Sequence, residues 1–171
     1  MLTKIEEAAD RFELEPVAVK ELLEELQTDL ADKLQEKGDR LVTNVADSVV
    51  IHGSRTLLYS IFRNLTENAI TYAGDGIEIV IRCYNENEDA YFIEFYDNGV
   101  GVEERHLVRI FERFYRVNEG RTRVTGGSGL GLSIVKNAVL FHKGSIVAKK
   151  RAEGGLYFLI TFPKKQGSKR D

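Results

Sequence analysis

The sequence contains very little cysteine and no long apolar segment. Cys83 is the only cysteine among 171 residues, which excludes a disulfide framework and any zinc site built on several cysteines. No apolar run approaches the roughly 20 residues of a membrane-spanning helix, and no signal peptide opens the sequence. We therefore expect a soluble, cytoplasmic polypeptide, and this expectation leaves open a membrane anchor in a longer parent protein.

Charge and composition narrow the class of protein. The formal net charge is −3, which argues against a dedicated nucleic-acid binder. With 43% hydrophobic and 30% charged residues, the chain has the composition of a globular domain and not of a disordered segment. A chain of this length buries enough surface to fold without a disulfide or a metal.

The spacing of apolar residues predicts both helices and strands. Apolar residues recur at three- and four-residue spacing in the expected helices, which are 17–37, 55–72 and 128–142. Alternation and β-branched residues predict strands at 41–46, 49–53, 77–84, 90–96, 145–151 and 156–162. These elements predict an α+β two-layer sandwich, with a mixed, mostly antiparallel sheet of about five strands and the main helices on one face.

Two asparagines lie on the helix expected over 55–72. On a helical wheel, Asn64 and Asn68 lie one turn apart on the same edge of the apolar stripe. Half-buried amides need hydrogen-bonding partners, so the pair either serves a ligand or hydrated cation or ties down neighbouring backbone. Glu67 is expected to point away from the core and is not a candidate base.

A DNGVG segment follows the strand expected at 90–96. Asp97 shares the parity of Ile93, so its side chain is expected to face the helices. Gly99 and Gly101 allow the backbone to come close to a ligand. A carboxylate there can accept a hydrogen bond from the exocyclic amine of a base; the alternative is an ordinary Asp-Asn-Gly turn.

The glycine-rich segment GGSGLGL, residues 126–132, leads into the third expected helix. Its backbone N–H groups and the helix N-terminus are suited to bind phosphate, and a flexible linker is the alternative. The segment is not a Walker A motif, because no Gly-Lys-Ser/Thr follows. It is also a poor Rossmann match, because no strand immediately precedes it.

An arginine-rich stretch lies between the two glycine segments and contains FERFYR at 111–116. A segment of this length without regular structure is often a lid. Its arginines are suited to hold phosphate oxygens, and Phe111 and Phe114 are expected to pin a flexible lid to the core. The alternative is a solvated charged loop.

In this order, the four motifs resemble the N, G1, F and G2 boxes of the catalytic and ATP-binding domain of two-component sensor histidine kinases. The resemblance covers residues 12–163 and implies the Bergerat-type ATP-binding fold, which that family shares with DNA gyrase, Hsp90 and MutL. It implies ATP and Mg²⁺ as ligands. Residues 1–11 resemble the end of a helix from a dimerisation domain, and residues 164–171 are expected to be a frayed tail.

The resemblance assigns roles by position. Asn68 matches the asparagine that coordinates Mg²⁺, Asn64 is expected to face the same region, and Asp97 matches the aspartate that reads the adenine amino group. Phe111 and Phe114 match the lid anchors. The other implied ATP-binding positions are Thr71, Tyr72, Gly99, Gly101, Val102, Ile110, Tyr115, Arg116, Gly127, Ser128, Gly129, Leu130, Gly131 and Leu132.

The chain lacks a phosphoacceptor of the family's kind. None of His52, His106 and His142 lies in a His-Glu/Asp-x-Lys/Arg-Thr/Asn-Pro sequence. We therefore expect transfer of the γ-phosphoryl group to a histidine on a separate dimerisation domain, for relay to a response regulator. No residue is assigned as a catalytic base, and the isolated domain is expected to be monomeric.

Departures from the family pattern leave other functions open. Thr71 replaces a common lysine that contacts phosphate, which is the one feature that favours a degenerate, non-catalytic binding module. A gyrase- or Hsp90-type ATPase is disfavoured because Asn64 occupies the position of the glutamate that activates water in those relatives. The long FERFYR lid disfavours a serine kinase of the anti-sigma type.

Overall fold

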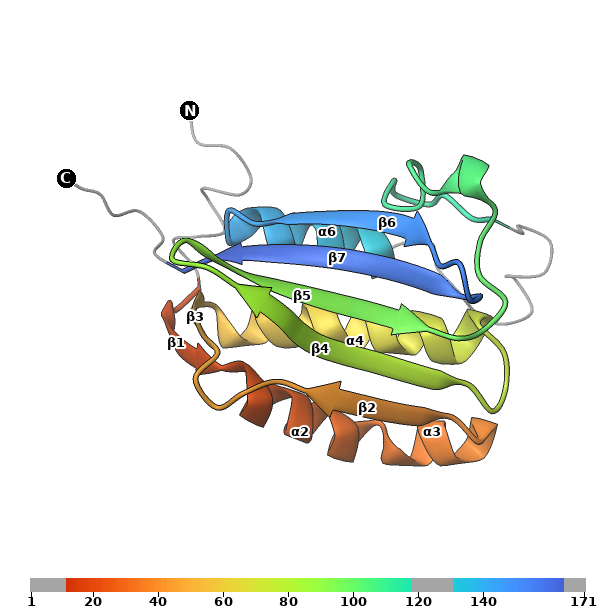
Figure 1. The fold of residues 1–171 in the computed structure, drawn as a ribbon, viewed down its shortest axis with the longest axis horizontal. Coiled ribbons are helices and arrows are strands. Elements are labelled where there is room, and N and C mark those ends of the chain that lie inside the picture. Colours follow the sequence, from red (N-terminus) through yellow and green to blue (C-terminus); the bar gives the residue numbers. More distant parts are fainter. Residues whose placement is uncertain (1–11, 118–130, 165–171) are drawn as a thin grey trace.

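The computed structural model describes residues 12–117 and 131–164, and these contain a five-stranded sheet with the strand order β2-β4-β5-β7-β6 (Figure 1). The strands are β2 (Arg40–Asn44), β4 (Glu78–Glu86), β5 (Ala90–Asp97), β6 (Ser145–Lys150) and β7 (Leu156–Pro163). β2 and β4 are parallel, and the other three pairs are antiparallel. The expected mixed, mostly antiparallel sheet is confirmed.

Four α-helices make up the second layer of the described part. They are α2 (Val19–Asp29), α3 (Ala31–Lys37), α4 (Arg55–Tyr72) and α6 (Gly131–Phe141). In Figure 1, α4 and α6 lie behind the sheet, and α2 and α3 run along β2 and pack on α4. None of the helices in the described ranges is long and apolar enough to cross a membrane.

The first helix differs from the expectation of one helix over 17–37. Residues Glu15–Ala18 form strand β1, which pairs with β3 (Val50–Gly53) in a separate two-stranded sheet. The helix that follows is interrupted at Leu30, whose backbone has φ −101° and ψ 6°. Leu26, Leu30 and Leu34 all stay buried across the break, so the apolar spacing did not reveal it.

The third expected helix is shorter in the described part, where it begins at Gly131; its expected first residues, 128–130, lie outside the described residues. The expected strand at 49–53 does not join the main sheet, because among the strands of the described ranges β3 pairs only with β1. Within the described part of the arginine-rich stretch, regular structure is limited to one 3-10 turn, Glu104–His106.

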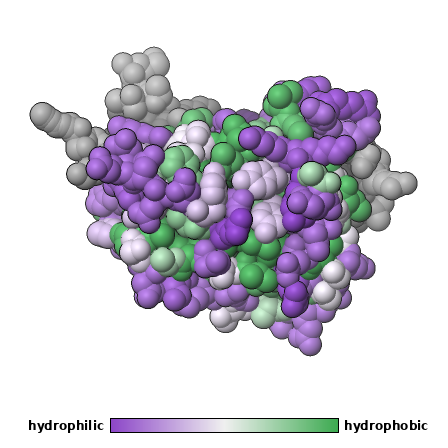
Figure 2. All heavy atoms as spheres, in the orientation of Figure 1, coloured by the Kyte–Doolittle hydropathy of each residue, from purple (hydrophilic) through white to green (hydrophobic). Residues whose placement is uncertain are grey.

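The core lies between the sheet and the helix layer. Phe62 and Leu65 of α4 pack against sheet residues such as Phe95 and Phe162, and all four are at most 1% exposed. Ser54 caps α4, because its hydroxyl oxygen accepts a hydrogen bond of 3.2 Å from Leu57 N–H. No helix of the described residues covers the opposite face of the sheet, and hydrophilic and hydrophobic side chains lie intermixed there (Figure 2).

Candidate nucleotide-binding site

The two asparagines of α4 face the beginning of α6. Asn64 Nδ2 donates to Ser60 O at 2.8 Å and to Ser60 Oγ at 3.0 Å. Because the amide nitrogen takes the carbonyl, Asn64 Oδ1 is left for other partners. A methyl group built on Gly131 would lie 3.4 Å from Asn64 Oδ1 and 3.5 Å from Asn68 Oδ1. Asn68 Nδ2 is almost as close, at 3.7 Å. Two half-buried side-chain amides therefore approach the same point.

This pair of amides fits a magnesium ion. Mg²⁺ prefers hard oxygen ligands, and it commonly takes a few from the protein and the rest from water and substrate phosphates. Asn64 and Asn68 supply two such oxygens beside the N-terminus of α6. Glu67, in contrast, pairs with Lys33 of α3 at 2.7 Å and with Arg63 at 3.5 Å, as expected for a side chain directed away from the core.

Asp97 lies at the end of β5 and is almost fully buried, with 4% exposed. It faces the helices, as the strand parity predicted. Its Oδ1 accepts a hydrogen bond of 2.9 Å from Gly99 N–H. Burial raises the pKa of the Asp97 carboxyl above its usual value, while the Gly99 and Leu156 N–H groups and Arg151 act in the opposite direction.

The loop that follows Asp97 packs on Ala73, the C-cap residue of α4. Val100 N–H donates to Ala73 O at 3.0 Å. A methyl group on Gly99 would lie 2.2 Å from Ala73 O and 2.7 Å from Ala73 Cβ, so only glycine fits this contact. Gly101 has φ 73°, which glycine adopts without strain. The Asp97 loop and the C-terminal end of α4 thus form one continuous side of the candidate site.

Two of the expected site residues, Thr71 and Tyr72, lie on α4 next to this contact. Tyr72 is 39% exposed and Thr71 is half-buried at the C-terminal end of the helix. The exposed ring of Tyr72 is compatible with stacking on a base.

The lid contacts the core through one of its two expected anchors. Phe111 packs edge-on against Phe158 of β7, with the ring centroids 6.0 Å apart. Phe114 is 61% exposed and has φ 66°, so the expectation that it packs on the core is wrong. Its left-handed backbone turns the ring outward, where Arg113 lies over it. Ile110 is 6% exposed and belongs to the core.

The remaining described lid residues place cations beside aromatic rings. Tyr115 hydrogen-bonds His106 Nδ1, and the Arg109 guanidinium lies 4.5 Å from the Tyr115 ring centroid. A hollow of about 320 Å³ is lined by Arg109, Glu112, Arg113, Phe114, Tyr115 and Arg116. Three arginines around one hollow are suited to phosphate oxygens. Val102 and Leu132 pack partly buried against the core.

Four expected phosphate-loop residues, Gly127, Ser128, Gly129 and Leu130, lie outside the described residues. Several contributors at the described site were missed in the sequence. Ser60 lies four residues before Asn64, and helical spacing alone would have identified it. Ala73 had no signal, because its role depends on a contact between segments that are distant in sequence.

The fold is that of histidine kinase catalytic domains. The solved structure of histidine kinase ThkA in complex with the response regulator protein TrrA matches with a TM-score of 0.73 at 21% identity, over 89% of this chain and 42% of that chain. Residues 53–166 match the family described as histidine kinase-, DNA gyrase B-, and HSP90-like ATPases. The chain belongs to this family.

Curated relatives agree with this placement. The phosphate regulon sensor protein PhoR of Pseudomonas aeruginosa is 37% identical over 146 residues, which are 85% of this chain and 33% of PhoR. The signal transduction histidine-protein kinase BaeS of Escherichia coli is 32% identical over 170 residues, which are 99% of this chain and 36% of BaeS. The chain spans about a third of the length of these relatives.

Proposed function

We propose that this domain binds ATP along α4 and transfers the γ-phosphoryl group to a histidine on a separate dimerisation domain. The bond between the γ-phosphorus and the ADP oxygen breaks, a bond from phosphorus to a ring nitrogen of that histidine forms, and ADP leaves. Phosphoryl transfer of this kind depends mainly on positioning and on neutralising charge. No residue of this chain is assigned as the base that removes the imidazole proton.

The observation that carries the proposal is the layout of α4. The side-chain amides of Asn64 and Asn68 lie against the N-terminus of α6, while the C-terminal end of α4 supports the loop of Asp97. We assign the adenine amine to Asp97, the metal and phosphates to Asn64, Asn68 and the start of α6, and the terminal phosphate to Arg116. Mg²⁺ held by Asn68 and Asn64 would neutralise phosphate charge.

The assignment of further ATP contacts follows the same layout. Tyr72 and Thr71 flank the nucleotide from α4, and Gly99 and Gly101 bring backbone to the base. The apolar border of the lid is formed by Val102, Ile110 and Tyr115, and Phe111 anchors the lid. The helix on the phosphate side begins with Gly131 and Leu132. The catalytic unit extends over residues 12–163.

The partners that we propose are a dimerisation domain that carries the histidine and a response regulator that receives the phosphoryl group. A solved histidine kinase of the same fold, ThkA, is in complex with the response regulator TrrA. We further propose that the domain acts in the cytoplasm and is monomeric by itself, because dimer contacts in such kinases are expected from the dimerisation domain. Sedimentation of the domain as a tight dimer would contradict the last point.

Calorimetric titration with ATP, with and without Mg²⁺, tests the proposal. Wild type is expected to bind at micromolar to sub-millimolar levels, about −8 to −5 kcal/mol. Asp97→Asn is expected to abolish binding, because the amide donates toward the adenine amine. Asn68→Ala is expected to remove mainly the dependence on Mg²⁺. Absence of any binding by wild type would replace the kinase assignment with a degenerate binding module.

Transfer is tested by adding a histidine-bearing dimerisation domain in trans. The expected result is acid-labile phosphate on that domain and little ATP turnover without it. Rapid multiple turnover of ATP by the isolated domain would instead favour a gyrase- or Hsp90-type ATPase. Asn64 argues against that outcome, because an amide whose nitrogen is bonded to Ser60 is not a base that activates water.

A further inference from the structure

His106 is a buried polar residue at the base of the lid. It ends the 3-10 turn Glu104–His106 and is only 9% exposed. Its backbone carbonyl accepts hydrogen bonds from Arg109 N–H at 2.9 Å and from Ile110 N–H at 3.0 Å. Ile110 is itself part of the hydrophobic core. The backbone of His106 is therefore fixed on the core side of the lid.

The His106 imidazole reaches across the lid to Tyr115, nine residues further along the chain. Its Nδ1 and the Tyr115 hydroxyl share a hydrogen bond, and the two ring centroids lie 5.8 Å apart. Tyr115 N–H also donates to Glu112 O at 3.1 Å, and the Tyr115 side chain packs partly buried against the core. Tyr115 is thus held at both its hydroxyl and its backbone, and it is the second anchor of the lid in place of Phe114.

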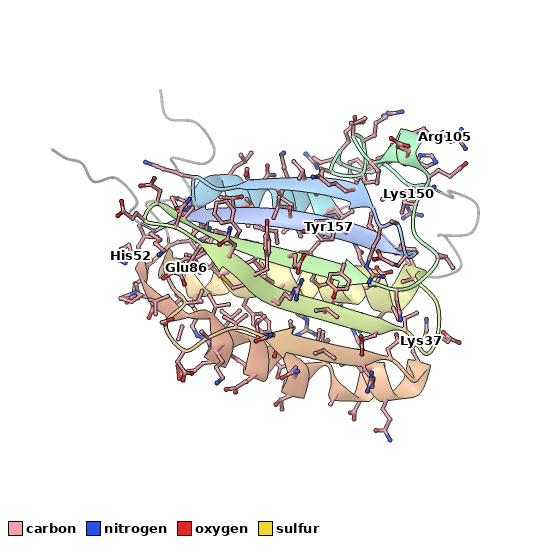
Figure 3. The ribbon with its side chains drawn as sticks, in the orientation of Figure 1. Lys37, His52, Glu86, Arg105, Lys150 and Tyr157 are labelled. Atoms are coloured by element: carbon pink, nitrogen blue, oxygen red, sulfur yellow. The ribbon has the colours of Figure 1, made fainter. Side chains whose placement is uncertain are left out.

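Other charged groups lie at the Nε2 edge of the His106 ring. Nε2 is 3.7 Å from Glu103 Oε1, a carboxylate whose side chain is 70% exposed. Glu103 in turn pairs with Arg105 at 3.0 Å. In Figure 3, the turn that carries Arg105 lies above the end of β6, where Lys150 is labelled. The bond at Nδ1 is therefore the one that joins the His106 ring to the arginine-bearing half of the lid.

The ring of Tyr115 supports one of the lid arginines. The Arg109 guanidinium carbon lies 4.5 Å from the ring centroid, and Arg109 Nη2 is 3.1 Å from Glu112 Oε1. A guanidinium held by a ring face and a carboxylate keeps one orientation. Arg109, Arg113 and Arg116 line the same hollow, in which Glu112 is the one carboxylate. Cations outnumber anions there, which favours an anionic ligand.

Helices and strands do not hold this half of the lid in place. Within the described part of the lid, the 3-10 turn ends at His106, and Phe114 has φ 66° with a side chain that is 61% exposed. Phe111 anchors the chain earlier, by its contact with β7. Tyr115 directly precedes Arg116. The bond between His106 and Tyr115 therefore fixes the chain next to the arginine to which we assign the terminal phosphate.

We propose that His106 is a positioning residue for the terminal phosphate of ATP, which rests on the function proposed above: its bond to Tyr115 holds the three arginines of the lid around one hollow. Guanidinium groups that are already in place bind phosphate oxygens without the cost of ordering flexible side chains. ADP lacks the γ-phosphate, so its binding depends less on this arrangement. His106 thereby favours ATP over ADP, and it acts through Tyr115.

The test is calorimetric titration of wild type, His106→Phe and Tyr115→Phe with ATP and with ADP in the presence of Mg²⁺. His106→Phe keeps a buried ring and removes the hydrogen bond, while Tyr115→Phe keeps the ring at Arg109 and removes only the hydroxyl. Each variant is expected to bind ATP ~3- to 10-fold more weakly, the range for the loss of one hydrogen bond. The affinity for ADP is expected to change by less than about 2-fold.

Two outcomes of these titrations would overturn the inference. Equal losses for ATP and ADP in both variants would mean that the bond supports the fold of the lid and not the terminal phosphate. Wild-type ATP affinity in both variants would mean that the arginines do not depend on the bond.

Three control variants separate the bond from the packing of the lid. His106→Asn places an amide near the position of Nδ1 and is expected to restore most of the preference for ATP. The double variant of His106→Phe and Tyr115→Phe is expected to lose no more than either single variant, because both remove the same bond. Val108→Ala, at a side chain that is 85% exposed in the same segment, is expected to bind both nucleotides as wild type does.

The Nε–H resonance of Arg109 in the nucleotide-free domain is the second readout. The Tyr115 ring shifts this resonance because the guanidinium lies over the ring, and His106→Phe is expected to move it toward the value of an unfolded peptide. An unchanged Arg109 resonance in folded His106→Phe would overturn the inference. A wild-type domain that binds neither nucleotide contradicts the proposed function instead, and the Arg109 resonance still decides whether His106 fixes the lid.

Discussion

His142 Nε2 accepts a hydrogen bond of 3.1 Å from the backbone N–H of Ser54. The other ring nitrogen, Nδ1, donates to Ala138 O at 2.7 Å. The ring is therefore neutral, because Nε2 must keep its lone pair to accept. The residue follows α6 and joins it to the junction of β3 and α4, close to Gly53, where any side chain would meet the imidazole ring at 2.3 Å.

The first prediction concerns the pH dependence of stability. Burial lowers the pKa of the His142 imidazole below the ordinary 6.5, although the bond to Ala138 opposes this. The unfolded chain then binds a proton below about pH 6.5 that the folded domain does not. The contribution of His142 is complete above that pH and is lost as the pH falls, by up to about 1.4 kcal/mol per pH unit. Urea unfolding across this range measures the slope.

Variants at two histidines isolate this effect. His142→Asn is expected to lower the free energy of unfolding at pH 8 by about 1–3 kcal/mol, because the buried Ser54 N–H loses its acceptor. It is also expected to reduce the acid slope. His52→Asn, at an exposed position of β3, is the control and is expected to change neither. An unchanged slope in His142→Asn would show that the acid loss arises from other groups.

Much of the fold was predictable because its signals are local. Alternation from residue 90 to residue 97 placed Ile93, Phe95 and Asp97 on one face, and helical spacing put Asn64 and Asn68 together. What joins distant segments was not predictable. Ser54 and His142 are 88 residues apart in sequence, and no local sequence pattern indicates their contact. The outward turn of Phe114 depends on a positive φ that its residue type does not indicate.

The second prediction concerns the contact between the Asp97 loop and α4. In Gly99→Ala the new methyl group would overlap Ala73 O, so the loop must move away from the helix. We expect a loss of about 1–3 kcal/mol in the free energy of unfolding and weaker ATP binding. Val100→Ala, at a side chain that is 78% exposed in the same loop, is the control. Wild-type affinity in Gly99→Ala would show that the base does not depend on this loop.

The third prediction separates the two phenylalanines of the lid. Phe111→Ala removes the edge-on contact with Phe158 and is expected to cost about 1–3 kcal/mol of stability, because a half-buried ring is lost. Phe114→Ala is expected to stay within about 0.5 kcal/mol of wild type, because its side chain is mostly exposed. Thermal unfolding of the nucleotide-free domain compares them, and equal losses would contradict the conformation of the lid described above.

The last prediction compares how much an ion pair and a buried leucine each contribute to the packing of α2 on α4. Arg55 and Glu25 pair across the two helices at 2.6 Å, but both side chains are nearly half exposed. Exposed ion pairs contribute little and are screened by salt, so Glu25→Gln is expected to cost less than about 1 kcal/mol. Its neighbour Leu26 is fully buried, and Leu26→Ala is expected to cost about 2–5 kcal/mol.

Denaturant unfolding at low and high salt distinguishes the two contributions. The loss in Leu26→Ala is expected to be independent of salt, whereas the small loss in Glu25→Gln is expected to vanish at about 1 M salt, where the screening length is ~3 Å. A loss in Glu25→Gln that equals the loss in Leu26→Ala would mean that the polar contacts hold α2 in place. Apolar burial is the stronger attachment because Leu22, Leu23 and Leu26 are each at most 1% exposed, whereas water reaches both members of the ion pair.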